Sequence, residues 1–564
     1  MKICNTTATA LTLVSLCGIA QAAHSDLIAW EHDQSIPASI ASTDLLSQHE
    51  IAQILLPSLP ADQRYAIESA GAFGSERSSC GHIPTPVEGR RGVIGLPQDP
   101  IDIHDPEFRS SMTAGQLAML DAMEQSIEEG YTLPQTCFSP DVDQKFVVAV
   151  NELFQRSLSN GNARFQGNDR WTSTATDGPG ILQGDPITLT YSYVPDGTFI
   201  PNIGIGTGSG TSVLFQWLNS RYGSPDVWQP LFDQVFDRWE ELIGVTYVYE
   251  PNDDGVNTNQ NIGVLGVRGD VRIGAFNLLN DSSNGGTLAY NNFPNDGDMI
   301  FDAFDSFYNN TAGNSRRLRN VIAHEHGHGL GMLHVCPINQ TKLMEPTAST
   351  AFDGPQLDDI LGGQRRYGDN FEPQSNDPSN PPFLGTVGVN GFAILENVSI
   401  DDNSDFDFYK FTLSSPGQVQ ISVAPSAGSY FQGPQNGNGS CSSGTLTDYN
   451  ARHDLSIFLL EGDSPFAPVL SVNDAPAGET ENLITNVFTP GDYLIQISGD
   501  STNGIQRYLL TLFIGSVGQC SDADIAAPFG TLNFFDISAY IGLYNDGDAA
   551  ADLAAPFGTL NFFD

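Results

Sequence analysis

The stretch His324-Glu325-His326-Gly327-His328-Gly329-Leu330-Gly331-Met332-Leu333-His334 decides how this chain is interpreted. His324 and His328 are four residues apart, so on a helix both imidazoles project from one face and can bind one metal ion. Gly331 tolerates a positive φ, which lets the chain leave the helix and turn back, so that His334 supplies a third ligand. Glu325 lies beside the first histidine, where it can accept a proton from water on the metal.

Three neutral nitrogen ligands leave the fourth position of a tetrahedral zinc site open. That arrangement is typical of a catalytic site, in which zinc lowers the pKa of its bound water to about 7. We therefore expect one catalytic Zn²⁺ held by His324, His328 and His334, with Glu325 as the general base. His326 lies about 200° around the helix from His324 and is not expected to touch the metal.

These residues resemble the signature of the metzincin zinc peptidases, HExxHxxGxxH followed by a methionine turn. Every fixed position of that signature is filled. The resemblance implies an endopeptidase that hydrolyses peptide bonds with zinc-activated water. It gives Met344, in Lys342-Leu-Met-Glu-Pro346, the role of a hydrophobic floor beneath the metal.

The flanking sequence, over roughly residues 168–368, is similar to the matrixin family of metzincins. Residues 358–368 are similar to the helix that closes a matrixin catalytic domain. Gly285-Gly-Thr-Leu-Ala289 matches the edge strand that pairs with substrate. The resemblance therefore implies protein or peptide substrates and assigns their pairing to Gly286, Thr287, Leu288, Ala289 and Tyr290.

The metal-binding loop of the family is matched by Gly297-Asp-Met-Ile-Phe-Asp302, with departures. The loop at residues 280–284 is too short for the family's structural zinc site, and Ile300 stands where one of its histidines would fall. No structural zinc is expected. Asp302 and Asp305 match the spacing of two acidic calcium ligands, so the resemblance implies one Ca²⁺ at this position.

Hydrophobic periodicity around the motif predicts an α+β domain at residues 168–368, with helices packed on a twisted mixed sheet. Residues 369–382 are rich in Asn, Asp, Pro and Ser, which is typical of a linker. The expected strands are 187–194, 245–249, 271–276 and 287–290, and the expected helices are 226–242 and 317–330.

An all-β sandwich is predicted for residues 383–517, because short strands alternate there with turn residues. It resembles the pre-peptidase C-terminal type of domain through Asp405-Phe-Asp-Phe-Tyr-Lys-Phe411 and Gly491-Asp-Tyr-Leu-Ile495. Residues 518–564 contain a repeat, 523–536 and 551–564, that loosely resembles calcium-binding dockerin units and stops short in its second copy. We expect these C-terminal domains to attach the protein to a surface or polysaccharide.

The first 22 residues are typical of a secretory signal, with Lys2, an apolar stretch at 11–20 and the cleavage site Ala20-Gln-Ala22. We expect cleavage after Ala22 and a secreted protein. No later apolar run reaches the roughly 20 residues needed to span a bilayer. Residues 23–167 show helical patterns at 113–129 and 142–158 but no recognisable chemistry, so we interpret them as a pro-region or N-terminal accessory domain.

The acidic balance, 67 Asp and Glu against 23 Lys and Arg, excludes nucleic acid and anionic membranes as expected partners. Five cysteines remain after export, at positions 80, 137, 336, 441 and 520, so at least one has no partner within the chain. Ser79-Cys-Gly-His-Ile-Pro84 faintly resembles the segment that places a cysteine thiolate on the zinc of latent matrixins. Such a switch at Cys80, or a disulfide between Cys80 and Cys137, both stay open.

Two other functions also stay open. One is an exported adhesion or binding protein with a vestigial metal site, and the other is a zinc hydrolase acting on a non-peptide bond. Glu325 counts against the first, since a purely structural zinc needs no base. An edge strand at Gly286 to Tyr290 that can pair with a peptide would favour the endopeptidase.

Overall fold

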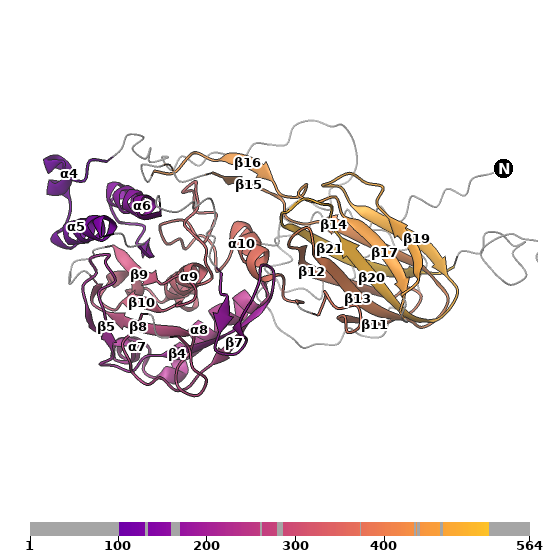
Figure 1. The fold of residues 1–564 in the computed structure, drawn as a ribbon, viewed down its shortest axis with the longest axis horizontal. Coiled ribbons are helices and arrows are strands. Elements are labelled where there is room, and N and C mark those ends of the chain that lie inside the picture. Colours follow the sequence, from indigo (N-terminus) through magenta and orange to yellow (C-terminus); the bar gives the residue numbers. More distant parts are fainter. Residues whose placement is uncertain are drawn as a thin grey trace, which may run out of the picture. The chain divides into compact units, whose positions relative to one another are not determined.

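The computed structural model describes residues 101–129, 133–158, 170–259, 262–278, 286–372, 374–433, 436, 440–462 and 466–517. The predicted leader, Cys80 and the C-terminal repeats lie outside these residues. The described residues belong to one compact unit, Gly95–Asp564. They form helices on a mixed sheet followed by an all-β region, which confirms the predicted fold class (Figure 1). No described helix has the length and apolar character that crossing a membrane requires.

A six-stranded mixed sheet frames the first part of the structure, in the order β1-β9-β10-β8-β4-β7. Strands β10, β8, β4 and β7 run parallel to one another, whereas β9 is antiparallel to β10 and β1 is antiparallel to β9. The strands are β1 (Gln135–Phe138), β4 (Ile187–Tyr193), β7 (Val245–Tyr249), β8 (Val271–Phe276), β9 (Thr287–Asn291) and β10 (Met299–Asp302). Short pairs are β2 (Ser173–Thr174) with β3 (Gly178–Pro179) and β5 (Phe199–Ile200) with β6 (Gly210–Thr211).

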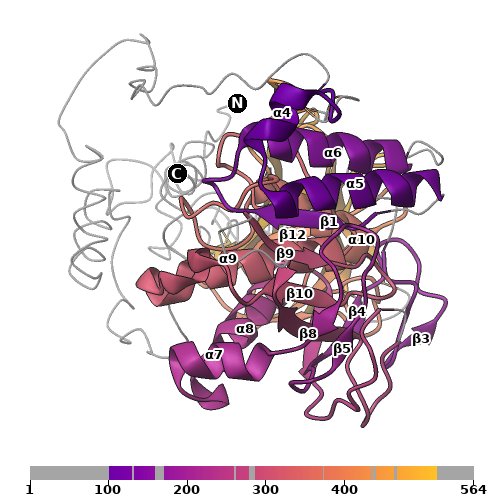
Figure 2. The same cartoon turned by 90° about the vertical axis from the view of Figure 1, so that its left-hand side faces the viewer.

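Helices cover both faces of this sheet (Figure 2). Neighbouring strand residues alternate between two cores: Phe276 and Ile300 pack with α5 and α6, whereas Ala275 and Phe301 pack with α7, α8 and α9. The sheet is buried on both sides, which gives α9 a rigid support. The helices are α4 (Pro106–Ser111), α5 (Ala114–Glu128), α6 (Gln144–Leu158), α7 (Leu214–Tyr222), α8 (Pro225–Glu240), η4 (Ser306–Asn309), α9 (Ala312–Gly329) and α10 (Leu357–Tyr367).

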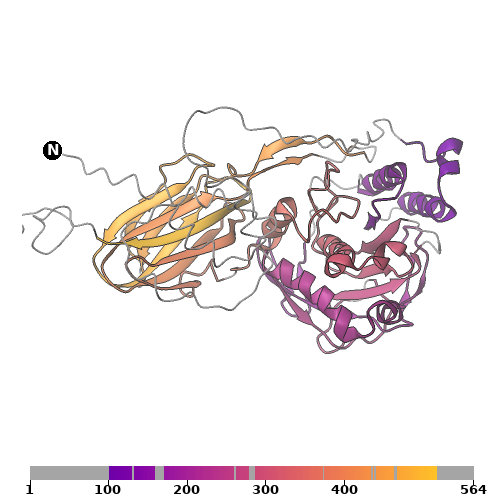
Figure 3. The same ribbon diagram turned by 180° about the vertical axis from the view of Figure 1, so that it is seen from behind.

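The all-β region packs two sheets, β11-β13-β20-β17-β18 and β12-β21-β14-β19, around one core (Figure 3). Inward residues alternate with outward ones, as Tyr409, Phe411 and Leu413 show in β13. The strands are β11 (Phe383–Val387), β12 (Phe392–Ile400), β13 (Phe406–Leu413), β14 (Gly417–Pro425), β17 (Ser456–Glu461), β18 (Pro468–Val472), β19 (Glu481–Val487), β20 (Gly491–Ser498) and β21 (Gln506–Gly515). A separate hairpin joins β15 (Ser429–Gln432) to β16 (Thr445–Asp448).

The cysteine pairing differs from the alternative that the sequence left open. Cys336 and Cys441 form a disulfide, while Cys137 is unpaired and buried. A disulfide between Cys80 and Cys137 is therefore wrong. The physical reason is the position of Cys137 in β1, where its fully buried side chain packs in the core that the sheet shares with α7, α8 and α9.

Candidate metal centre

Helix α9 carries His324, Glu325 and His328 into the core between β9 and α8. At its end, the Leu330 N–H donates to the His326 carbonyl (2.8 Å), and the chain then reverses at Gly331, whose φ is 92°. L side chains rarely adopt this conformation. Gly331 thus makes the turn that the motif predicted, and the turn returns His334 to the helix.

The three histidine rings lie together. Their centroids are 4.8 Å apart for His324 and His328, 5.3 Å for His324 and His334, and 4.9 Å for His328 and His334. One ligand atom from each lies within 4.8 Å of the other two. We call these three residues the histidine triad.

Hydrogen bonds at the Nδ1 atoms fix the ring orientation of two of the three histidines. Nδ1 of His324 donates to the Leu343 carbonyl and Nδ1 of His328 donates to the Met332 carbonyl, both at 2.7 Å. A ring that donates through Nδ1 keeps the Nε2 lone pair free when it is neutral. All three Nε2 atoms are buried and have no hydrogen-bond partner, so the donor set fits one zinc ion.

Burial also sets the charge of the site. It lowers the pKa of His324 to about 4. It also lowers the pKa values of His328 and His334 well below the usual range of histidine, with repulsion among the histidines as the second cause. The rings are therefore neutral near pH 7, which is the form that binds metal. Burial raises the pKa of Glu325, whose Oε1 accepts the Cys137 N–H (3.3 Å) and whose Oε2 has no partner.

The predicted methionine floor packs against α9. A Cβ at Gly327 would lie 2.3 Å from the Met344 sulfur, so this close approach requires glycine at that position. The backbone N–H groups of Leu343 and Met344 donate to the carboxylate of Asp359 in α10, at 2.8 and 3.0 Å. Asp359 thus holds both Met344 and the segment whose carbonyl orients His324. Sequence reasoning gave Asp359 no role, although it lies in the helix that the matrixin resemblance covers.

Strand β1 lies along the predicted substrate-pairing strand. It runs antiparallel to β9, with Cys137 opposite Ala289. On its other edge, the Phe138 N–H donates to the Pro346 carbonyl (3.2 Å) and the Ala348 N–H donates to the Phe138 carbonyl (2.8 Å). An extended segment of the chain itself therefore lies between β9 and the segment after Met344, with backbone hydrogen bonds to both.

Side chains of the same N-terminal segment reach the histidine triad. Gln135 Oε1 accepts the His334 N–H (2.8 Å), and Asn151 Oδ1 lies 3.3 Å from Nδ1 of His334. The sulfur of Cys137 lies within 4.8 Å of ligand atoms of His324 and Glu325, and burial followed by the Glu325 charge raises the pKa of Cys137. Sequence reasoning found no chemistry in this segment, because its partners lie far along the chain.

The remaining predicted residues lie apart from the triad. His326 points to the other side of α9, with Nε2 2.7 Å from the Tyr247 hydroxyl. Asp302 and Asp305 each accept a backbone N–H two residues further on, at 2.9 and 2.7 Å. Neither belongs to a described group of three side chains able to hold a metal, so calcium at these two residues remains a prediction.

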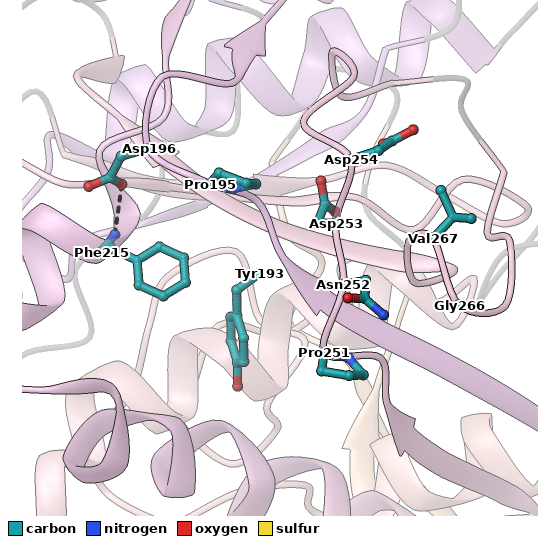
Figure 4. Close-up of a pocket in the computed structure, with 10 residues that line it drawn as sticks. All are labelled: Tyr193, Pro195, Asp196, Phe215, Pro251, Asn252, Asp253, Asp254, Gly266 and Val267. Carbon is teal, nitrogen blue, oxygen red and sulfur yellow. Dashed lines mark hydrogen bonds between the residues drawn. The ribbon is translucent and has the colours of Figure 1, made fainter.

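A separate pocket of about 570 Å³ shares no residue with the triad (Figure 4). Its acidic side chains already have partners. Asp253 pairs with Arg272 at 2.7 Å, and Asp254 pairs with Arg268 at 2.6 Å. Asp196 accepts two N–H groups at the start of α7. The lining residues are Tyr193, Pro195, Asp196, Phe215, Pro251, Asn252, Asp253, Asp254, Gly266 and Val267.

Comparison with known proteins adds a family match over part of the chain. Residues 219–368 match the family model described as Matrixin. No curated protein matches the chain. The matrixin match and the histidine triad together fit a zinc metallopeptidase of the metzincin type.

Solved structures resemble parts of the chain only distantly. The pre-peptidase C-terminal domain of a collagenase from Bacillus anthracis is 17% identical, covering 24% of this chain and 98% of that chain, with a TM-score of 0.14. PliG of Aeromonas hydrophila, a periplasmic inhibitor of g-type lysozyme, is 16% identical over 24% and 97%, with a TM-score of 0.14. A carbohydrate binding module of Cellvibrio mixtus lichenase 5A is 12% identical over 20% and 71%, with a TM-score of 0.13.

Proposed function

We propose that this protein is a secreted zinc-dependent endopeptidase that cleaves extended polypeptide segments. The observation that carries the proposal is the histidine triad beside Glu325, next to the extended strand β1 that lies between β9 and the segment after Met344. Export through the leader and attachment through the C-terminal domains belong to the proposal and rest on the sequence alone.

The chemistry follows from the residues of the triad and Glu325. The three Nε2 atoms would hold the zinc, which would supply Lewis-acid chemistry towards a scissile carbonyl and a water molecule. Glu325 takes the proton of the attacking water on its unpartnered Oε2 and passes it to the leaving amine.

Backbone pairing positions the substrate. The main-chain groups of β9 on one side and of Pro346 and Ala348 on the other bind main-chain groups of whatever lies between them. Such contacts select an extended peptide rather than a particular side chain. We infer that a substrate takes the direction that β1 takes, antiparallel to β9, which favours a peptide over a non-peptide substrate.

The same pairing makes the N-terminal segment an inhibitor. A substrate enters only when β1 leaves, so residues 23–167 act as the pro-region and hold the enzyme latent. The backbone contacts on both edges of β1 carry this latency, and the Cys137 thiol contributes little.

The test uses the full chain with a specific protease site placed between residues 158 and 170, so that the N-terminal segment is cut off after folding. If the open form is at most about 1% populated before the cut, hydrolysis of a quenched peptide library should rise by roughly two orders of magnitude. A zinc chelator should abolish it. Cys137→Ser in the uncut chain should remain latent.

Two results would overturn parts of the proposal. A cut chain that carries zinc but cleaves no peptide would favour the binding-protein alternative. An uncut Cys137→Ser chain that is as active as the cut parent would assign latency to the thiol instead of the strand.

A further inference from the structure

Three acidic side chains meet where the segment after α10 reaches β13. Glu372 comes from that segment, Asp405 precedes β13, and Asp407 lies within it. One carboxylate oxygen from each lies within 4.8 Å of the other two. All three are buried, and Asp407 is 0% exposed. We call these three residues the carboxylate site.

Each carboxylate has one oxygen that is held and one that is not. Glu372 Oε2 accepts from Asn376 Nδ2 (2.7 Å), Asp405 Oδ2 accepts the Asp401 N–H (2.8 Å), and Asp407 Oδ2 accepts from the Tyr508 hydroxyl. The second oxygens, Glu372 Oε1, Asp405 Oδ1 and Asp407 Oδ1, are buried and have no hydrogen-bond partner. Buried polar atoms without a partner are costly, and ionised ones are more so.

Positive charge near the carboxylate site acts on the neighbouring acids Asp369 and Asp401, from Arg507 and Arg365 respectively. Among the described residues, no Lys, Arg or His forms an ion pair with any member of the carboxylate site. Two further buried acids, Asp369 and Asp401, add negative charge nearby. Burial, followed by repulsion from neighbouring carboxylates, raises the pKa of Glu372 to about 10 and also raises the pKa of Asp407.

Protons alone satisfy this arrangement poorly. If the three free oxygens were protonated, each would become an O–H donor. The same three oxygens are the free acceptors of the carboxylate site, so not all three donors could find an acceptor there. A single divalent cation satisfies all of them at once. The donors are oxygens only, which suits a hard cation, and Ca²⁺ binds oxygens at 2.3–2.6 Å, so any two of its ligands are at most about 5 Å apart. The observed spacing falls within that limit.

We propose that the carboxylate site binds one calcium ion, which fastens the segment after α10 to the first residues of β13. The segment is already attached at two points, because Asp369 accepts the Ser399 N–H of β12 (2.8 Å) and the Ser375 carbonyl accepts the Phe408 N–H of β13 (2.6 Å). The ion adds an attachment between these two points. This site is distinct from Asp302 and Asp305, and it is independent of the proposed peptidase activity.

The test measures calcium binding and thermal unfolding of the full chain. Protein is freed of calcium by dialysis, and its zinc content is checked by mass spectrometry. Calcium titrated by calorimetry should bind this site with a stoichiometry of about one. At a calcium concentration about 100-fold above the Kd, the midpoint of sandwich unfolding should rise by roughly 5–10 °C.

Asp407→Asn separates a cation site from a merely structural cluster. The amide is nearly isosteric and can still accept from the Tyr508 hydroxyl, so the variant should fold. Without calcium it should melt at or above the parent, because the variant removes a buried carboxylate that otherwise stays charged or takes up a proton. With calcium its melting midpoint should not move, and the calorimetric binding at this site should be lost.

Asp377→Asn is the matched control, since it makes the same charge change in the same segment at an exposed residue. It should keep the calcium response of the parent. The proposal is overturned if the parent binds no calcium, or if Asp407→Asn binds and responds as the parent does.

Discussion

The histidine triad and the carboxylate site are both buried, and both contain side-chain atoms without hydrogen-bond partners. Burial, however, has opposite consequences for the charge of the two sites. Burial, followed by repulsion among the histidines, lowers the histidine pKa values and so keeps the triad neutral. The acids of the carboxylate site become neutral only by taking up protons, and they otherwise need a cation. A zinc site can therefore exist preformed without its metal, whereas the carboxylate site depends on its ion for stability.

The two sites also differ in how the chain assembles them. The triad comes from one helix and the turn after it, within eleven residues. The carboxylate site joins residues 372, 405 and 407 across a domain boundary predicted from the sequence. The first can act on a substrate that takes the place of β1, while the second lies at a junction and can only hold it together.

The largest expected effect comes from His328→Ala. Zinc content should fall from about one per chain to near zero, because three ligands are the least that a catalytic zinc site uses. Peptide hydrolysis should fall to background, while the calcium-dependent melting shift should stay at the parental value. Metal analysis and calorimetry on the same sample check both. Loss of calcium binding together with zinc would break the comparison, since the sites would then not be independent.

Asp359→Asn sharpens the comparison by testing a buried acid outside the carboxylate site. Burial, followed by the Asp358 charge, raises the pKa of Asp359 to about 7, although three backbone N–H groups donate to it. The folded state then binds the extra proton, so its stabilising contribution is present below about pH 4 and is lost as the pH rises through 7. About three pH units at about 1.4 kcal/mol each set an upper bound of about 4 kcal/mol.

The measurement compares unfolding free energies of parent and Asp359→Asn between pH 4 and 8 by tryptophan fluorescence. The difference between the two proteins cancels the titration of the zinc ligands. The unfolding free energy of Asp359→Asn should rise relative to that of the parent as the pH rises. A shift towards the parent would mean that the three N–H donors outweigh burial and keep Asp359 ionised.

The smallest expected effect comes from Gly331→Ala. A residue with a Cβ at φ 92° adds strain of about 1–2 kcal/mol. Because Gly331 makes the turn to His334, zinc affinity should fall by up to about tenfold. Gly354→Ala is the control: its φ is 77° and only Arg238 lies near the new Cβ, at 3.7 Å, so it should lose similar stability but keep zinc affinity. Equal zinc affinity in both variants would show that Gly331 does not position His334.

Sequence patterns predicted the elements whose signal is local. The helix at 226–242 and the strands at 245–249 and 271–276 correspond closely to α8, β7 and β8, because each carries its own apolar periodicity. Strand β1 was missed, since Gln135–Phe138 is short and buried on both faces and therefore shows no alternation. Its importance lies in pairing with residues about 150 positions away, which no spacing rule reveals.

The residues of the candidate site also fall into those with a local sequence signal and those without one. His324, His328 and His334 could be found because helix geometry turns their spacing into proximity. Asp359 and Cys137 could not, because their roles depend on contacts with distant segments. Glu372 could not be predicted either, because it lies in a polar segment typical of a linker. Composition does not distinguish a buried acid from a solvated one in such a segment.

The central claim, that Glu325 makes this metal centre a peptidase, is tested most directly by Glu325→Gln in the chain cut free of its N-terminal segment. The amide keeps the size of the side chain and the three histidine ligands but cannot accept the proton of water. Peptide hydrolysis should fall by at least about 10²-fold, since general-base catalysis typically contributes about 10²–10⁴-fold, while zinc content and melting temperature stay at the parental values. A zinc-loaded variant that cleaves peptides at the parental rate would contradict the account.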